Sequence, residues 1–173
     1  MQGTKTTAHS QIVPSDLLKK YLEQKDVFYQ TTIIWTVDDS IKSIIGDKLY
    51  SEQIPVGRIM NNGSIATFGS DSIDGPIAWN AFLNIFVGIK RGENPPHFFP
   101  SNNDGITVSQ GVDGYTINGA KQQRADDNIG SITAGKSADF VIISHDIFNI
   151  PTRKILTTKV LETWFRGEIV YKK

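Results

Sequence analysis

The chain has 173 residues, 18 basic and 18 acidic side chains, and no cysteine. The balanced charge gives no basic surface for nucleic acid, and the lack of cysteine excludes disulfides, thiolate metal sites and a cysteine nucleophile. No apolar run approaches the roughly 20 residues of a membrane span, and the N-terminus has no signal-peptide core. We therefore expect a soluble, cytoplasmic protein that binds neither nucleic acid nor membrane.

The first half of the chain alternates strand-like and helix-like segments. β-branched, aromatic or continuous apolar composition predicts strands over residues 4–9, 27–32 and 64–68. Apolar residues at spacings of three and four, or turn and cap signals, predict helices over residues 16–25, 41–45, 52–61 and 77–90. This alternation predicts parallel strands with right-handed crossovers, and hence an α/β layer or part of a barrel. A complete (β/α)8 barrel needs about 250 residues, so only a partial barrel is possible.

The second half changes in character along its length. Residues 92–105 are rich in proline and asparagine and predict a surface loop, and residues 107–124 predict a helix that its glycines kink or pack closely. After a turn-rich link at 130–136, residues 139–143 predict a buried strand. Two further strands, 159–165 and 168–171, are joined by the turn Arg166-Gly167. This part of the chain therefore predicts an antiparallel sheet.

Two residues at the ends of predicted strands are candidates for metal binding or catalysis. His9 ends the first predicted strand, and Asp71 follows the third. If the strands are parallel neighbours, both side chains emerge at the same carboxyl edge and can converge on one metal ion. Imidazole and carboxylate suit Zn²⁺, but a catalytic zinc needs three protein ligands, so the pair is only part of a site. From these residues alone a purely structural role is equally open, in which Asp71 caps a following helix.

Other polar residues give weaker signals. His97 lies in a proline-rich loop, where a loop role or a place in a lid over the pocket is expected, and His145 lies in a predicted turn. Gln11 and Gln30 stand near strand ends, where they could hydrogen-bond a substrate. No Gly-x-Ser-x-Gly motif marks a serine nucleophile. None of these residues adds a third metal ligand.

The order of several motifs resembles the C-terminal part of the metal-dependent amidohydrolases, in particular the amidohydrolase-3 or YtcJ-like branch, some members of which are labelled exoenzyme regulatory proteins. The motifs are His9-Ser10-Gln11, Gly69-Ser70-Asp71-Ser72, Gly114-Tyr115-Thr116-Ile117-Asn118, Gly130-Ser131-Ile132, Ser137-Ala138-Asp139-Phe140-Val141 and Gly167-Glu168-Ile169-Val170. The resemblance covers nearly the whole chain, and its most specific part runs from Gly130 to Val141.

The resemblance implies the last βα units of a (β/α)8 barrel over residues 1–128 and strands of a small β-sandwich over 129–173. It also implies hydrolysis of non-peptide C–N bonds with a divalent metal, with zinc as the first candidate. His9 would be the metal ligand of strand six, and Asp71 both a ligand and the general base of strand eight. The family's His-x-His pair, its bridging Lys or acid and its further His have no counterpart in these 173 residues.

Two functions from different classes follow. The first is the C-terminal portion of a metal-dependent hydrolase on a small-molecule substrate, inactive in isolation. The second is a non-catalytic binding or regulatory protein that keeps part of the fold. In both, open strand edges predict self-association or association with the missing N-terminal part. A third, blander possibility is an unrelated α/β domain in which His9 lies on the surface.

Overall fold

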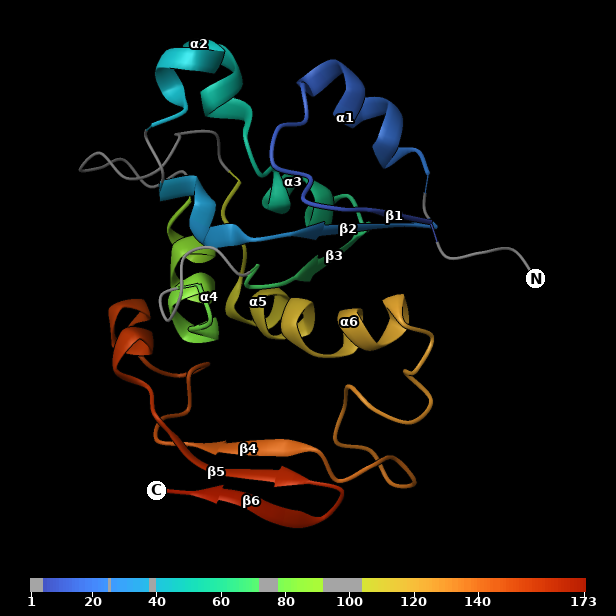
Figure 1. The fold of residues 1–173 in the computed structure, drawn as a ribbon, viewed down its shortest axis with the longest axis vertical. Coiled ribbons are helices and arrows are strands. Elements are labelled where there is room, and N and C mark those ends of the chain that lie inside the picture. Colours follow the sequence, from blue (N-terminus) through green and yellow to red (C-terminus); the bar gives the residue numbers. More distant parts are fainter. Residues whose placement is uncertain (1–4, 25, 38–39, 72–77, 92–103) are drawn as a thin grey trace.

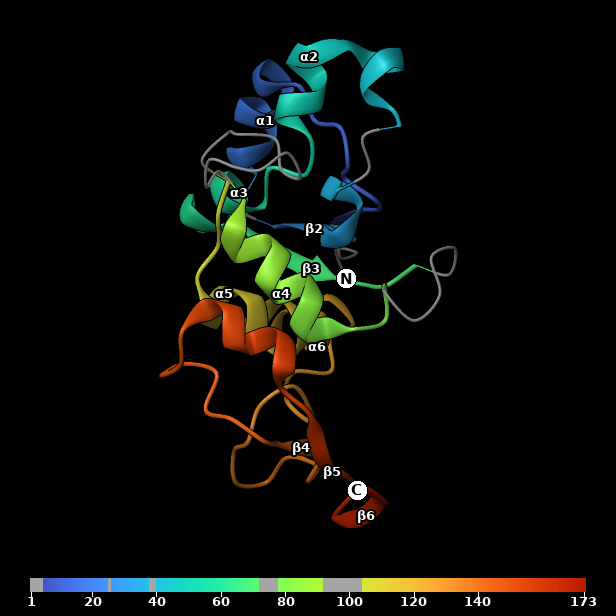
Figure 2. The same cartoon turned by 90° about the vertical axis from the view of Figure 1, so that its left-hand side faces the viewer.

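A computed structural model describes residues 5–24, 26–37, 40–71, 78–91 and 104–173. The described chain is a mixed α/β structure with two three-stranded sheets. Figures 1 and 2 show the parallel sheet in the upper half, the helices α4, α5 and α6 below it, and the antiparallel sheet at the bottom. The helical layer therefore separates the two sheets.

The upper sheet consists of β1 (Lys5–Thr7), β2 (Val27–Thr31) and β3 (Ile65–Phe68) in that order. Both neighbouring pairs are parallel, with Thr7 opposite Tyr29 and Tyr29 opposite Ala66. The three predicted strands and their parallel pairing are confirmed. Their carboxyl ends thus lie at one edge of the sheet, which is the edge that carries His9 and Asp71.

The structure has a helix in each of the five segments predicted as helical, but the number and the extent of the helices differ from the prediction. They are α1 (Ser15–Leu22), α2 (Lys42–Glu52), α3 (Val56–Asn61), α4 (Ala81–Lys90), α5 (Val108–Tyr115) and α6 (Ile117–Gln122), with 3-10 turns η1 (Ile33–Val37) and η3 (Thr152–Thr157). The expected end of the 41–45 helix at Gly46 is confirmed, because Gly46 (φ 78°, ψ 164°) is not helical and divides α2. A second helical piece, which the sequence did not predict, follows it up to Glu52. The next helix accordingly begins at Val56 and not at residue 52.

The helix predicted over 77–90 starts later than expected. The Asn80 side chain accepts a hydrogen bond from the backbone N–H of Leu83 at 3.1 Å and so caps α4, which begins at Ala81. Trp79, which falls within the predicted range, lies before the helix and is 64% exposed. Residue 77 and most of the loop predicted at 92–105 lie outside the described residues.

The single helix predicted over 107–124 is two helices. Thr116, at φ −128° and ψ −97°, is not helical and divides the predicted helix into α5 and α6. The close packing predicted at the glycines is found at Gly114, where an added Cβ would lie 2.2 Å from a ring carbon of Phe68. Gly114 therefore allows α5 to approach β3, although the break itself falls at a threonine.

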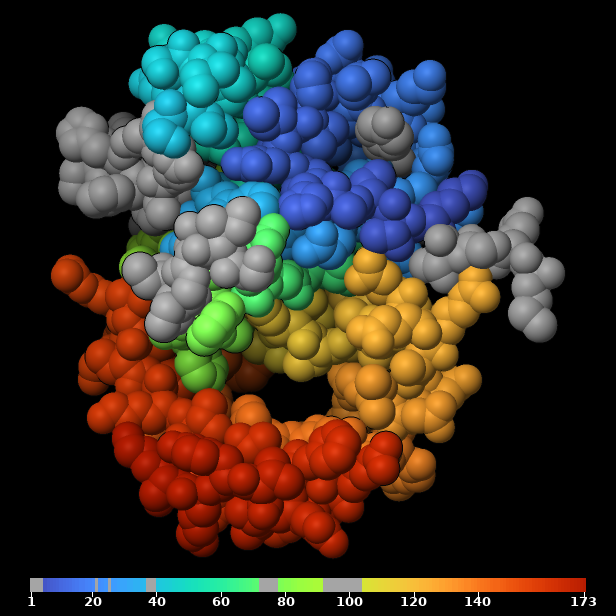
Figure 3. All heavy atoms as spheres, in the orientation of Figure 1, coloured from blue at the N-terminus to red at the C-terminus, as the bar shows by residue number. Residues whose placement is uncertain are grey.

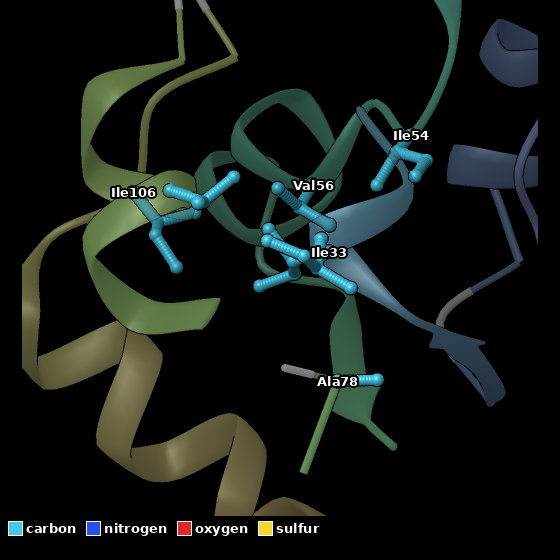
Figure 4. Packing of buried hydrophobic residues seen from close by; sticks show 7 residues of the cluster. Ile33, Ile54, Val56, Ala78 and Ile106 are labelled. Atoms are coloured by element: carbon cyan, nitrogen blue, oxygen red, sulfur yellow. The ribbon is translucent and has the colours of Figure 1, made fainter. Parts of the chain in front are cut away.

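Two apolar clusters hold the upper half together. One lies around Leu18, Tyr29 and Ala66, where α1 covers the sheet. The other gathers side chains from η1, α3, α4 and the segment before α5, as Figure 4 shows for Ile33, Val56 and Ile106. These clusters fix the helices against the strands and leave the carboxyl edge for polar residues.

The lower sheet pairs β4 (Phe140–Ile143), β5 (Val160–Phe165) and β6 (Glu168–Lys172) in antiparallel order, as predicted. The prediction that residues 139–143 form a buried strand is wrong. Val141 is 50% exposed and Ile142 42% exposed. Because consecutive strand residues point to opposite faces, both faces of the sheet are open to solvent at β4.

A cavity of about 780 Å³ separates the helical layer from this sheet. It is lined by residues of β3, α5, α6 and β4, among them Phe68, Tyr115, Ile117 and Phe140. Figure 3 shows the opening as a dark gap between the two halves of the molecule. Burial in its wall raises the pKa of the Tyr115 hydroxyl above its usual range. In the part of the chain that the structure describes, no helix is long and apolar enough to cross a membrane.

Candidate functional site

His9 follows β1 by two residues and is held from β2. Its backbone N–H donates to Oε1 of Gln30 at 3.1 Å, and its carbonyl oxygen accepts from the hydroxyl of Thr31 at 2.9 Å. The Gln30 amide also lies against Gly69, where an added Cβ would come within 2.9 Å of Nε2. Gln30 therefore lies between the loop that carries His9 and the loop that carries Asp71.

Asp71 follows β3 by three residues and lies beside His9 across β2. The distance from His9 Nδ1 to Asp71 Oδ2 is 3.7 Å. The His9 side chain is 63% exposed and the Asp71 side chain 23% exposed, so the imidazole is open to solvent and the carboxylate is more sheltered. The two residues expected to converge at the carboxyl edge do lie together there.

The backbone at both residues is unusual. His9 has φ 64° and Asp71 has φ 49°, values in the left-handed region that residues other than glycine rarely adopt. Such conformations cost of order 1–3 kcal/mol each and persist where the surroundings impose them, often at functional sites. Both residues lie at the carboxyl edge of the sheet, in the loops after β1 and β3, the two strands that flank β2.

The sequence gives no indication that Trp35 contacts His9. Its ring stacks on the His9 imidazole, with centroids 5.6 Å apart and planes 6° apart. Trp35 lies in η1, directly after β2, in a region where the pattern of the sequence was weak. The imidazole is thus bounded by an indole and by a carboxylate. The sequence predicts Gln30 only as a polar strand-end residue that could bind a substrate, and nothing in the sequence indicates its hydrogen bond to the His9 backbone.

The donor set fits two positions of a metal site. Two zinc ligands with bonds of about 2.0–2.1 Å in tetrahedral geometry stand about 3.3 Å apart, so the observed 3.7 Å needs a shift of only a few tenths of an ångström. Within the described ranges, however, no group of three or more His, Cys, Asp or Glu side chains could hold a metal ion. Among the residues that the structure describes, His9 and Asp71 are therefore an incomplete donor set.

The other candidates do not join this pair. Gln11 contributes its carbonyl oxygen, which accepts the backbone N–H of Ile54. His145 lies in a bend after β4, where its Nδ1 is 2.8 Å from the Ser144 hydroxyl. His97 lies outside the described residues. The structure thus brings together His9, Asp71 and Gln30, and places His145 elsewhere.

Comparison with known proteins identifies the family. The profile of the amidohydrolase family, Amidohydro_3, matches residues 1–171. The chain belongs to the amidohydrolase family. YtcJ of Bacillus subtilis strain 168, which is named as an amidohydrolase, is 23% identical over 177 residues, covering 95% of this chain and 31% of YtcJ.

Solved structures share the fold. A metal-dependent hydrolase from Pyrococcus horikoshii matches 87% of this chain and 30% of its own, with a TM-score of 0.69 and 19% identity. An adenosine deaminase from Xanthomonas campestris with bound zinc matches 96% of this chain and 37% of its own, with a TM-score of 0.68 and 14% identity. The chain thus has an amidohydrolase fold and spans about a third of the length of these relatives.

Proposed function

We propose that this chain supplies the C-terminal part of a metal-dependent hydrolase that acts on non-peptide C–N bonds of a small molecule. The observation that carries the proposal is the placement of His9 and Asp71, 3.7 Å apart at the carboxyl edge of a parallel sheet. The family match over residues 1–171 supports it. Sites at this edge of parallel strands are where such folds place their chemistry.

In this proposal His9 and Asp71 would hold a divalent metal, with zinc as the first candidate, together with further ligands that are not found among the described residues. The metal would supply a Lewis acid and an acidified water. Asp71, whose carboxylate is sheltered from solvent, would act as the general base that accepts a proton. Gln30 and Thr31 hold the His9 backbone, and Trp35 limits the rotation of its ring.

The same proposal assigns residues 1–128 to a partial (β/α)8 barrel and residues 129–173 to strands of a β-sandwich. The parallel order β1, β2, β3 and the solved structures of the same fold support the first assignment. The exposed faces of the antiparallel sheet support the second, since a sandwich sheet needs a partner layer. A cytoplasmic location remains part of the proposal.

The test is complementation. The chain is produced alone and together with the part of YtcJ that it does not match, and metal content and hydrolysis of a panel of N-acyl amino acids are measured. We expect substoichiometric metal and no hydrolysis from the chain alone. The complemented sample should bind metal, and its metal affinity should fall at least tenfold in His9→Ala and in Asp71→Asn. The His145→Ala variant is the matched control and should behave as the unaltered chain.

Two outcomes contradict the proposal. Stoichiometric zinc and a measurable hydrolysis rate in the chain alone would show that the site is complete without further ligands. Complemented samples that bind metal equally well with and without His9 would remove this residue from the site. Stable complexes that never bind metal would favour the alternative, a non-catalytic binding or regulatory protein, for which the incomplete donor set is the supporting observation.

A further inference from the structure

Asn84 is the only residue with a polar side chain in the apolar stretch of α4 that runs from Ala81 to Ile89. The residue has no exposed surface. A leucine would suit both this helix and the core around it, whereas burial of an amide costs stability unless its polar atoms are hydrogen-bonded. The Asn84 amide is therefore stable at this position only through the hydrogen bonds that it makes.

Both ends of the Asn84 amide are hydrogen-bonded. Oδ1 accepts from the backbone N–H of Ile34 at 3.0 Å. Nδ2 donates to the carbonyl oxygens of Ala78 at 3.1 Å and of Asn80 at 3.0 Å. The opposite orientation of the amide would place its NH2 group against an N–H group and its oxygen against two carbonyl oxygens. The surroundings therefore fix one orientation of this side chain.

The bond to Ile34 satisfies the start of η1. The first N–H groups of a helical turn have no acceptor within the turn, and Ile34 is the second residue of η1. Ile34 is buried, and an unpaired backbone N–H in a buried place costs stability. Asn84 thus caps η1 from a helix that lies 50 residues further along the chain.

η1 carries the ring that stacks on the His9 imidazole. Trp35 directly follows Ile34, and its ring centroid lies 5.6 Å from that of His9. The apolar side chains of Ile33 and Ile34 hold η1 in the core, but hydrophobic attraction has no preferred direction. A hydrogen bond is directional, so the bond to Asn84 fixes the backbone of η1 at Ile34 and with it the direction of the next side chain.

We propose that Asn84 is a positioning residue of the candidate site, which acts on the His9 ring through η1 and Trp35. Its three hydrogen bonds go to η1 and to the segment before α4, so the amide links the segments that follow β2 and β3. As a statement about catalysis this inference rests on the proposed hydrolase function. The placement of the ring can be measured in the chain alone.

Asn84→Leu tests the placement by NMR. The substitution suits the helix but removes the acceptor for the Ile34 N–H. We expect the ring protons of His9 to move downfield, in the same direction as in Trp35→Leu, because the shielding indole leaves its stacked position. In the Trp35→Leu background, Asn84→Leu should cause no further shift. The matched control is Asn80→Ala, which removes the side-chain cap of α4 and leaves the bond to Ile34 in place.

Asn84→Ala, which also removes the amide and introduces a good helix former, is the second variant in case Asn84→Leu does not fold. Hydrogen exchange is the second measurement. In either variant the Ile34 amide should exchange faster, relative to the amides inside α4, than it does in the unaltered chain, because its acceptor is lost.

Three results would overturn the proposal. The first is a set of His9 signals that stay in place in a folded Asn84 variant, or that move equally in Asn80→Ala. The second is an unchanged relative exchange of the Ile34 amide. The third is a further His9 shift when Asn84→Leu is added to Trp35→Leu, since the effect would then not pass through the indole. None of these measurements needs a metal or a substrate, so their failure is distinct from a failure of the complementation test.

Discussion

The imidazole of His9 is controlled from one short segment, β2 and the turn after it. Gln30 and Thr31 hold the backbone of His9, and Trp35 stacks on its ring. Stacked aromatic pairs contribute about 0.5–1.5 kcal/mol beyond the area that they bury. A ligand side chain that is 63% exposed would otherwise sample several rotamers. The orientation of His9 toward Asp71 therefore depends on residues that are not themselves metal donors.

Replacement of Trp35 tests this dependence. In Trp35→Leu we expect the ring protons of His9 to move downfield in the NMR spectrum, because the indole ring current shields a stacked neighbour, and we expect their signals to broaden as the ring samples more rotamers. The matched control is Trp79→Leu, since Trp79 is 64% exposed. Unchanged His9 signals in Trp35→Leu would show that the stack does not persist in solution.

At the scale of elements, the packing of α5 on β3 depends on the absence of a side chain at Gly114. An added Cβ there would meet ring carbons of Phe68 at 2.2 and 2.3 Å, whereas at Gly119 in α6 it would meet nothing within 4 Å. Substitution by alanine should therefore have opposite effects on stability at these two glycines, which lie in consecutive helices. Gly114 is required by close approach, and Gly119 only weakens its helix.

The pair Gly114→Ala and Gly119→Ala makes the difference measurable by urea denaturation. Gly114→Ala should lower the free energy of unfolding by about 1–3 kcal/mol through overpacking against Phe68. Gly119→Ala should raise it by about 0.5–1 kcal/mol, the usual advantage of alanine within a helix. Equal effects of the two substitutions would contradict the observed contact between α5 and β3.

The lower sheet carries a pH-sensitive contact. Hydrogen bonds from Lys172 at 2.9 Å and from Trp164 at 3.0 Å lower the pKa of Glu162 below its ordinary value of 4.5. A depressed carboxyl pKa stabilises the folded state above the unfolded pKa, and this contribution is lost as pH falls through the folded pKa. The pairing of β5 with β6 should therefore weaken only in acid.

A ¹³C NMR titration of the Glu162 carboxyl group tests this. We expect its midpoint below 4.5, and a shift toward 4.5 in Lys172→Met, because that variant removes the hydrogen bond from Lys172, the main cause of the lowered pKa. Lys173→Met is the control for the loss of a nearby positive charge. A midpoint unchanged by Lys172→Met would mean that the ion pair between Lys172 of β6 and Glu162 does not form in solution.

The sequence predicts elements whose pattern is local. The three parallel strands and the hairpin at Arg166-Gly167 have distinct composition and turn residues, and all are found. The break at Thr116 and the late start of α4 depend on tertiary contacts and on one cap, which periodicity does not encode. The exposure of β4 could not be predicted either, because an apolar run gives the composition of a strand and not the presence of a covering layer.

For the candidate site, the positions of His9 and Asp71 follow from the rule that parallel strands end at one edge. Asp104 is different, since it falls in a stretch predicted as a surface loop and is nevertheless fully buried. Nothing in its neighbours along the sequence indicates that burial. Its partner Arg58 is 46 residues away, and only the folded chain brings the two together.

At the scale of the whole molecule, both sheets of the described chain have outer strands, and apolar side chains are exposed. β1 and β3 are the outer strands of the parallel sheet in the described chain, and apolar side chains are exposed on the antiparallel sheet, including Val141, Phe165 and Val170. Unpaired strand edges and apolar faces promote association with other chains. These surfaces support the proposed association with a second copy or with the part of the relatives that this chain does not span.

Size-exclusion chromatography with light scattering tests the self-association. We expect the mass to rise above that of one 19.2 kDa chain as concentration increases. Val170→Lys, which places a charge at a residue of β6 that is 61% exposed, should shift the equilibrium toward the monomer. A strict monomer at high concentration in the unaltered chain would contradict this prediction.

The turn between β5 and β6 also bears on the order in which the molecule folds. Arg166 and Gly167 have φ values of 51° and 82°, the two positive angles of a type I′ turn, which suits the twist of a hairpin. Hairpins of this kind close in about 1–10 μs, whereas parallel strands must wait for long crossovers to form. The lower sheet should therefore assemble before β1, β2 and β3 pair. During that interval the late-forming parallel strands are the part of the chain most open to misfolding and to capture by chaperones.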